Sequence, residues 1–350
     1  MMDGTEAIGL RFPWERPPGP GEATEVADGI LWLRLPLPMK LDHVNVYALD
    51  EGDHWSIVDT GMDLASSREA WDALLAGPLA GKPVGRVLLT HHHPDHVGLL
   101  GWFAGRDAEV WATRLGWTLA RMLQLDHNEV PPPEQLAFRR RAGMPADLLE
   151  KFATERPFNF SMCTAPIPLG YRAVTEGAGI RIGGRDWTVH FGHGHAPDHA
   201  TFWSTDGTLV LAGDQIIPGI SSNIGVYPSE PEADPLADWL ESCARLRRVA
   251  GETDALVLPG HKLPFRGVGF RLTQLSENHE GALERVLATL RRGPRTAAEL
   301  FEPIFKREIG GSQYGLALAE SVAHMNHLFH AGRVSRRLRD GAWIYAAEAE

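Results

Sequence analysis

The segment of residues 87–98, VLLTHHHPDHVG, constrains the fold and chemistry of this chain more than any other part of the sequence. A short apolar run leads into a loop with the pattern H-x-H-x-D-H, formed by His91, His93, Asp95 and His96. Packing alone rarely requires so many metal-binding groups within one short loop. We therefore expect the loop to bind metal rather than to be an ordinary polar loop.

The spacing of these side chains suggests two metal sites. Residues two apart in extended chain project to the same side, so His91 and His93 can bind one ion. Asp95 and His96 then turn toward a neighbouring ion. A zinc ion takes about four donors, and a catalytic site keeps one position for water, so this loop cannot complete two sites. Further ligands must lie downstream.

Three later segments each combine an apolar run, a glycine and a potential ligand. They are FGHGHAPDH at 191–199, LVLAGD at 209–214 and LVLPGH at 256–261. Glycine lets the chain turn sharply at the end of a strand and approach a metal closely. Taken singly, a Gly-His or Gly-Asp pair is usually an ordinary core or surface feature, and His193 and His195 both follow a glycine. The ordered set is what indicates a site.

The order H-x-H-x-D-H, G-H-x-x-x-H, G-D and G-H resembles the metallo-β-lactamase superfamily over residues 23–264. Asp59-Thr60-Gly61, after the apolar run 55–58, is similar to an early D-T-G element of that family. The resemblance implies a first metal bound by His91, His93 and His195. It implies a second metal bound by Asp95, His96 and His261, with Asp214 bridging the two.

The resemblance also assigns supporting roles. It favours His195 over His193, because only His195 has the G-H-x-x-x-H spacing to His199. Asp59 and His199 match positions that orient the ligand imidazoles. Asp95, Asp214 and His199 are the candidate catalytic residues. His92 is expected to be structural or to face solvent.

The fold that the resemblance implies is of the α/β class, a four-layer αβ/βα sandwich. We expect an N-terminal extension at 1–22, a catalytic domain at 23–268 with a helical, lid-like insertion at 113–172, and a winged-helix-like domain at 269–350. In that last domain, helical periodicity covers 271–292 and 316–330, and Thr296 is placed to cap a helix beginning at Ala297. A hairpin then turns at Asp340-Gly341.

The insertion contains apolar side chains that could line an acyl or ring pocket, or could simply pack the insertion onto the sandwich. These side chains are Trp117, Met122, Phe138, Met144, Phe152, Phe158, Phe160 and Met162.

The composition of the chain limits the kinds of molecule that this protein is expected to bind. The net charge of −11 repels phosphate backbones, and from Glu280 onward ten basic and nine acidic side chains leave no strongly basic surface for nucleic acid. We therefore expect a small-molecule substrate. We expect the C-terminal domain to dock against the catalytic domain or to form a homodimer. Two cysteines, no signal-peptide pattern and no apolar run long enough to span a bilayer predict a cytoplasmic protein without a membrane partner.

The two predicted metals determine the expected reaction. Water held between two divalent ions loses a proton near neutral pH, and the resulting bridging hydroxide can attack a carbonyl. Zinc, two ions per chain, is the expected metal because imidazoles dominate the donors, although iron or manganese is possible. We expect cleavage of an ester, a thioester or a lactone. The alternatives are an endoribonuclease or phosphodiesterase, a β-lactamase, and a noncatalytic metal-binding regulator.

Overall fold

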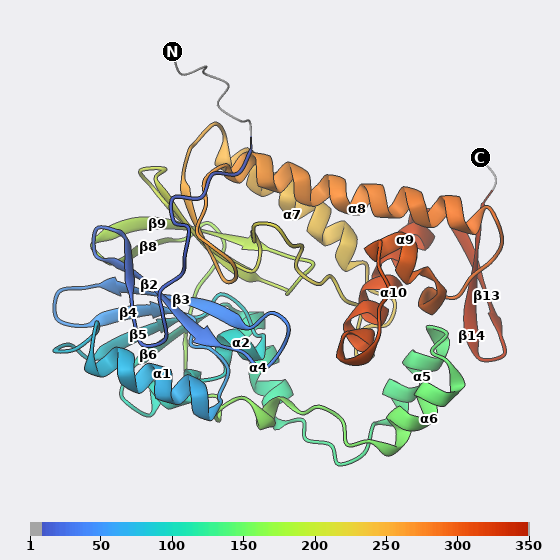
Figure 1. Cartoon of the computed structure of the whole chain (residues 1–350), viewed down its shortest axis with the longest axis horizontal. Helices are drawn as coiled ribbons and strands as arrows, with labels where there is room; N and C mark the ends of the chain where they lie inside the picture. The colour runs from blue at the N-terminus through green and yellow to red at the C-terminus, as the bar shows by residue number, and fades with distance from the viewer. Residues whose placement is uncertain (1–8, 349–350) are drawn as a thin grey trace.

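The computed structural model, which describes residues 9–348, has two β-sheets that face each other between outer layers of helices (Figure 1). This is the α/β sandwich that the sequence predicted. The two sheets share a buried apolar core in which Trp32, Tyr47 and Leu88 of one sheet pack with Trp187 and Phe202 of the other.

The first sheet has seven strands in sequence order. The strands are β1 (Thr24–Ala27), β2 (Ile30–Pro36), β3 (His43–Asp50), β4 (Trp55–Val58), β5 (Val84–Leu88), β6 (Glu109–Ala112) and β7 (Arg172–Ala173). Strands β1 to β4 pair antiparallel, whereas β4 to β7 run parallel. Parallel strands end at the same edge of a sheet, so the loops after β4 and β5 emerge side by side.

The second sheet has five strands in the order β12-β11-β10-β9-β8. The strands are β8 (Gly179–Ile182), β9 (Arg185–Gly192), β10 (His199–Ser204), β11 (Leu209–Gly213) and β12 (Leu256–Pro259). Strands β11 and β12 are parallel, and the other pairs are antiparallel. All residues of β10, β11 and β12 are buried. A sheet covered on both faces needs such continuous apolar strands.

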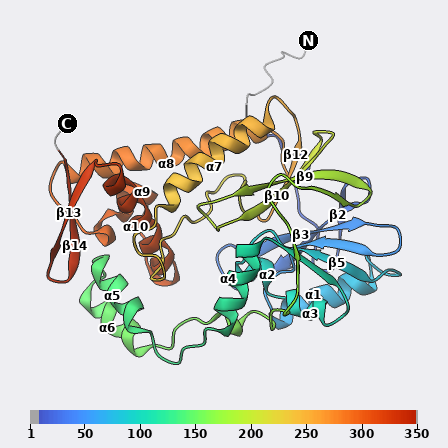
Figure 2. The same ribbon diagram turned by 180° about the vertical axis from the view of Figure 1, so that it is seen from behind.

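Helices cover the outer face of each sheet. Helix α1 (Ala65–Ala76) packs Trp71 and Leu74 against the first sheet, together with α3 (Leu100–Ala104). Helices α7 (Pro235–Ala250) and α8 (Val268–Leu290) lie side by side against the second sheet (Figure 2). The short helix α2 (Pro94–Val97) lies within the histidine-rich loop.

A helical segment separates β6 from β7, as predicted for residues 113–172. It contains α4 (Arg114–Leu125), α5 (Pro133–Arg141), α6 (Ala146–Thr154) and the 3₁₀ helix η1 (Phe160–Met162). Within it, the sequence shows helical periodicity at 115–125 and 145–152, which matches α4 and α6. Helix α5 was not predicted separately. Its sequence, PEQLAFRRR, is mostly polar and carries no apolar stripe that would mark a helix.

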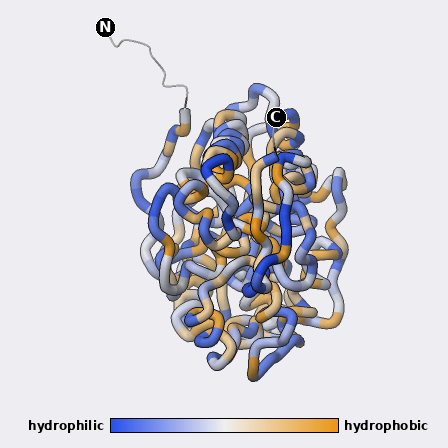
Figure 3. Tube along the Cα trace, turned by 90° about the vertical axis from the view of Figure 1, so that its right-hand side faces the viewer, coloured by the Kyte–Doolittle hydropathy of each residue, from blue (hydrophilic) through white to orange (hydrophobic). Residues whose placement is uncertain are grey.

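The C-terminal part follows the predicted order. It contains α8, the 3₁₀ helices η2 (Ala297–Leu300) and η3 (Gly311–Gln313), α9 (Phe301–Phe305), α10 (Tyr314–His330), and a hairpin of β13 (Val334–Arg339) and β14 (Ala342–Ala347). Thr296 and Glu299 form a capping box, although the turn they cap is 3₁₀ rather than α-helical. Asp340 and Gly341, at φ of 52° and 84°, form the predicted two-residue turn. Figure 3 views the molecule from this end, where hydrophilic segments are prominent.

At the N-terminal end, residues 9–22 form no helix or strand and meet the sandwich at the Arg11–Arg266 bridge. The remainder of the predicted N-terminal extension, 1–8, lies outside the described residues. Within 9–348, none of the helices has the length and apolarity required to cross a membrane.

Candidate metal centre

Loops at one edge of the two facing sheets bring the predicted metal ligands together. The loop after β5 supplies His91 and His93, and α2 supplies Asp95 and His96. The loop after β9 supplies His195, Asp214 directly follows the last residue of β11, and His261 follows β12 after Gly260. The ligand atoms fall into three overlapping groups: His91, His93 and His195; His91, His96 and Asp214; Asp95, His96 and His261.

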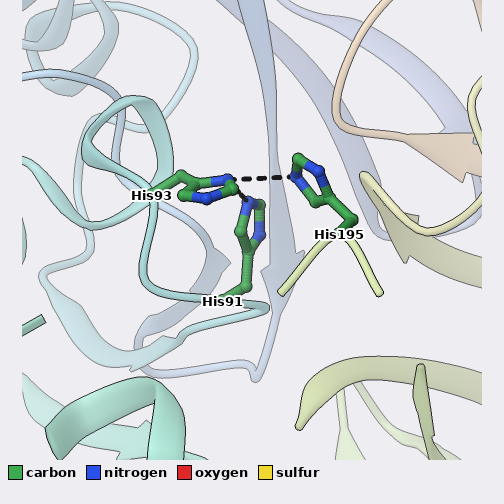
Figure 4. A group of neighbouring side chains, drawn as sticks. All are labelled: His91, His93 and His195. Carbon is green, nitrogen blue, oxygen red and sulfur yellow. Dashed lines mark hydrogen bonds between the residues drawn. The ribbon is translucent and has the colours of Figure 1, made fainter. Parts of the chain in front are cut away.

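The first group consists of three imidazoles that point toward one another (Figure 4). His93 Nδ1 lies 3.0 Å from His91 Nε2 and 3.0 Å from His195 Nε2. A neutral imidazole has one protonated nitrogen, so three converging nitrogens cannot all satisfy one another by hydrogen bonds. A metal ion can accept all three lone pairs.

The second group lies next to the first and joins it through Asp214. His261 Nε2 is 3.3 Å from the Asp95 carboxylate and 3.2 Å from Asp214 Oδ2. Asp214 Oδ2 also lies 3.6 Å from His195 Nε2, and Asp214 Oδ1 lies 3.4 Å from His96 Nε2. The carboxylate of Asp214 is therefore positioned between the two groups of imidazoles.

Hydrogen bonds on the far sides of the rings fix which nitrogen faces the centre. His96 Nδ1 donates to Asp59 at 2.8 Å, His195 Nδ1 donates to the Asn223 carbonyl at 2.9 Å, and His261 Nδ1 donates to the His43 carbonyl at 2.7 Å. In its neutral form each ring then presents the lone pair of Nε2 to the centre. This is the tautomer of a histidine that ligates a metal through Nε2.

Two buried atoms of the centre lack a hydrogen-bond partner among the described residues. They are His96 Nε2 and Asp214 Oδ1. A buried polar atom without a partner is costly, and a divalent cation would satisfy both atoms at once. The donor set, imidazole nitrogens with carboxylate oxygens, fits zinc, iron or manganese.

Electrostatics in the centre also favour a cation. Burial, together with neighbouring imidazoles, holds the pKa of His91 and of His93 well below the ordinary value, which keeps these rings neutral. Burial alone would also lower the pKa of His261, but Asp214 and Asp95 outweigh it and raise that pKa to about 10. The carboxylates thus attract positive charge to the position of the second group.

Glycine permits the close approach of two strand ends. A Cβ on Gly260 would lie 2.3 Å from Asp214 Oδ1 and 2.8 Å from His96 Cε1. A side chain at this position would displace the donors, which explains the Gly-His pair at 260–261.

Family comparisons agree with this geometry. Residues 39–261 match the family model described as the metallo-beta-lactamase superfamily, and 283–348 match the one described as the metallo-beta-lactamase-like C-terminal domain. The chain belongs to the metallo-β-lactamase superfamily. Membership confirms the resemblance drawn from the sequence, implies binding of a divalent metal, and indicates a metal-dependent hydrolase. The exact domain boundaries and the winged-helix description stay predictions.

Relatives in the superfamily span most of the chain. The structure of a beta-lactamase domain protein from Burkholderia ambifaria is 36% identical, with a TM-score of 0.86 over 97% of each chain. The probable metallo-hydrolase YqjP of Bacillus subtilis is 27% identical over 86% of this chain and 92% of its own. Acyl-coenzyme A thioesterase MBLAC2 of Gallus gallus is 26% identical over 73% of this chain and 84% of its own.

The remaining predicted residues lie around this superfamily centre. Asp59 contacts His96 as expected and accepts hydrogen bonds from both the backbone and the hydroxyl of Thr90. His199 stacks on His91 at 4.6 Å, and its Nε2 accepts a hydrogen bond from the Asp214 backbone. It lies outside the three ligand groups, so the geometry favours the orienting role over direct catalysis.

Two further histidines were considered from the sequence. His193 also lies outside the ligand groups, and its Nδ1 accepts a hydrogen bond from the Asp198 backbone. The expectation that His92 could face solvent is wrong, because its side chain is buried and its ring lies 4.6 Å from that of His93. The tight turn between two ligands holds the ring inside the protein.

Thr90, Asn223 and His43 contact ligands or their partners and were not predicted. Thr90 lies next to the histidine run, so its hydroxyl was a visible candidate. Asn223 and His43 act through backbone carbonyls. Every residue has a carbonyl, so the sequence carries no signal for these two contacts.

Proposed function

We propose that this protein is a dinuclear zinc hydrolase that cleaves a thioester, or a related ester or lactone. The observation that carries the proposal is the position of Asp214, whose two carboxylate oxygens face imidazoles of both ligand groups. We assign His91, His93 and His195 to one ion and Asp95, His96 and His261 to the other, with Asp214 shared. Iron or manganese would fit the same donors.

Different side chains have different roles in the proposed hydrolysis. When bound, a pair of divalent ions lowers the pKa of water and polarises the scissile carbonyl. Asp59 and the carbonyls of Asn223 and His43 hold the imidazoles in their ligand orientation. Asp95 is more exposed than Asp214, at 17% of its side chain against 8%, so it is the carboxylate better placed to receive a proton from entering water.

Apolar side chains beside the metal loop support an acyl substrate. The segment after η1 is held to the loop region by hydrogen bonds from the Ala165 backbone to Gly98 and from the Asp63 backbone to Cys163. Of the apolar side chains predicted to line a pocket, Met122, Phe158 and Met162 are exposed. Met162 adjoins this segment, and we propose that it and the other exposed apolar side chains form the surface that contacts a substrate chain.

Other members of that predicted set have packing roles. Phe138 and Met144 pack against the core formed by the second sheet and the C-terminal helices, and Trp117 packs against the first core. The Arg139 guanidinium lies 3.7 Å from the centre of the Phe152 ring. The acyl surface is therefore limited to the exposed members.

The relatives support thioesters over phosphodiesters. One curated relative is named an acyl-coenzyme A thioesterase, and it covers most of this chain. A nuclease would need a strongly basic surface, yet three of the four arginines of the C-terminal hairpin region, Arg333, Arg336 and Arg339, pair with Glu284, Glu232 and Asp340. We therefore propose no nuclease activity.

The test is a hydrolysis assay with the zinc-loaded protein. Acyl-coenzyme A esters of increasing chain length, an acyl lactone and a short RNA are offered, and release of free thiol, acid or nucleotide is measured. We expect thioester or ester turnover, and we expect Asp214→Ala to reduce kcat/KM by more than about 100-fold, since losing even an outer partner of a metal ligand costs 10–100-fold.

The matched control is His54→Gln. His54 contacts the Asp53 carboxylate in the loop before β4, away from the ligand groups. This variant should keep full activity. Turnover of RNA alone, or equal turnover by Asp214→Ala and the unmodified protein, would overturn the proposal.

A further inference from the structure

A second group of potential metal ligands lies outside the metal centre, between two helices of the C-terminal part. His279 comes from α8, and Glu320 and His324 come from α10. One ligand atom from each side chain lies within 4.8 Å of the others. His279 and His324 are buried, at 4% and 0% exposure, and Glu320 is partly buried.

The backbone places these three side chains in a metal-binding arrangement. Glu320 and His324 are four residues apart on α10, so they share one face of the helix. His279 Nδ1 lies 3.4 Å from His324 Nε2. Two nitrogens that bind one tetrahedral zinc ion at 2.0–2.1 Å are separated by about 3.4 Å.

Hydrogen bonds on the far sides of both rings leave the facing nitrogens available. His324 Nδ1 donates to the Glu320 carbonyl at 2.8 Å, so in the neutral ring Nε2 carries the lone pair. His279 Nε2 lies 3.0 Å from the Ser221 hydroxyl, which can accept its proton and leave Nδ1 free. Burial lowers the pKa of His279 to about 3 and of His324 to about 4, so both rings are neutral at pH 7.

Glu320 can supply negative charge to the same position once a cation binds there. Burial raises the pKa of its carboxyl to about 8, and the strongest opposing influences are hydrogen bonds from Asn223 and the Ile224 backbone. A divalent cation between the carboxylate and the two lone pairs would stabilise the ionised form. The side-chain oxygen of Asn223 is also buried without a hydrogen-bond partner in the part of the chain described.

We propose that His279, Glu320 and His324 bind a third metal ion, zinc by the chemistry of the donors, which joins α10 to α8. Two imidazoles and one carboxylate are a common zinc ligand set, and ligands from two helices fix the packing of those helices. The competing arrangement is a hydrogen bond from one ring to the other with no ion. The site does not depend on the proposed catalytic activity.

The site connects to the catalytic centre through one residue. The Asn223 side chain donates to the Glu320 carboxylate at 2.7 Å, and the Asn223 backbone carbonyl accepts from His195 Nδ1 at 2.9 Å. An ion that fixes Glu320 therefore also fixes the segment that orients His195. The third ion is a structural one that supports a ligand of the proposed catalytic centre.

The first test is metal content by mass spectrometry of protein loaded with zinc and freed of excess ion. We expect His324→Gln and His279→Gln each to hold one zinc fewer per chain than the unmodified protein. The control is His327→Gln on the same helix, whose ring contacts Asp234, and it should lose none. Equal zinc in all four proteins overturns the third site.

A second measurement does not depend on those variants folding. Protein with His91, His93 and His261 each replaced by alanine keeps the α8–α10 ligands, and it is stripped of metal and titrated with Co²⁺. We expect one saturable site with the intense visible absorption of tetrahedral cobalt. Absence of that absorption overturns the third site, whereas its presence without hydrolytic activity in the unmodified protein would overturn only the proposed function.

Discussion

At the scale of single residues, the side chains that converge on the candidate metal centre were predictable, and the groups that hydrogen-bond to them were predictable only in part. His91, His93 and His261 stand in motifs with a fixed spacing after apolar strands, and the structure places them together. Asp59 was also predicted, because it stands in a D-T-G element. It occupies a positive φ of 63°, which a residue other than glycine adopts only where surrounding contacts hold it.

Asp59 provides a prediction at this scale. Both of its oxygens accept hydrogen bonds, from the Thr90 backbone and hydroxyl and from His96 Nδ1. In Asp59→Asn one acceptor becomes a donor, so one of these contacts is lost. We expect the affinity for the second metal, measured by competition with a chelator, to fall 10–100-fold.

The matched control is Asp53→Asn, which changes an exposed carboxylate that contacts His54. This variant should bind metal as the unmodified protein does. An unchanged affinity in Asp59→Asn would show that Asp59 does not orient His96.

At the scale of helices and strands, prediction succeeded where an apolar pattern had a clear end. The apolar run at 55–58 coincides with β4, and the helical periodicity of the sequence at 66–75 lies within one residue of each end of α1. Helix α7 was not predicted, although Asp234 caps it and Pro235 begins it. The His279–Glu320–His324 cluster carries no local motif, since its members come from two helices that meet only in the folded chain.

The helix pair α8–α10 provides a prediction about pH. The folded-state pKa values of His279 and His324, about 3 and about 4, lie below the ordinary 6.5 of an unfolded chain. Below pH 6.5 the unfolded chain therefore binds more protons, and stability falls as the pH drops toward 4. The carboxyl of Glu320 has a raised folded-state pKa of about 8, so it contributes stability at low pH that is lost as the pH rises toward 8. It therefore opposes part of the loss of stability at acid pH, but the two imidazoles outweigh the one carboxyl.

The measurement is urea unfolding of metal-free protein at pH 6.5 and pH 5. The unmodified protein should lose on the order of 1–2 kcal/mol more stability over this interval than His324→Gln, which lacks one of the two imidazoles. Parallel losses in the two proteins would show that the ring of His324 gains its proton as readily in the folded protein as in the unfolded chain.

At the scale of the whole molecule, the sandwich and the family were predictable because the ligand motifs mark four strand ends in a fixed order. The contact between the C-terminal helices and the catalytic centre was not. It runs through Asn223, whose side-chain amide donates to the Glu320 carboxylate 97 residues away and whose backbone carbonyl accepts from His195 Nδ1. These groups meet only in the folded protein. The C-terminal helices therefore help to hold His195 of the candidate metal centre in place, through Asn223.

The central claim is that seven side chains bind two metal ions around Asp214. Crystals of the protein purified without chelator, measured at the X-ray absorption edge of the metal it contains, test this claim most directly. The account predicts two anomalous peaks, one among His91, His93 and His195 and one among Asp95, His96 and His261, with Asp214 contacting both. A single peak, no peak, or His261 lying away from Asp95 and His96 would contradict it.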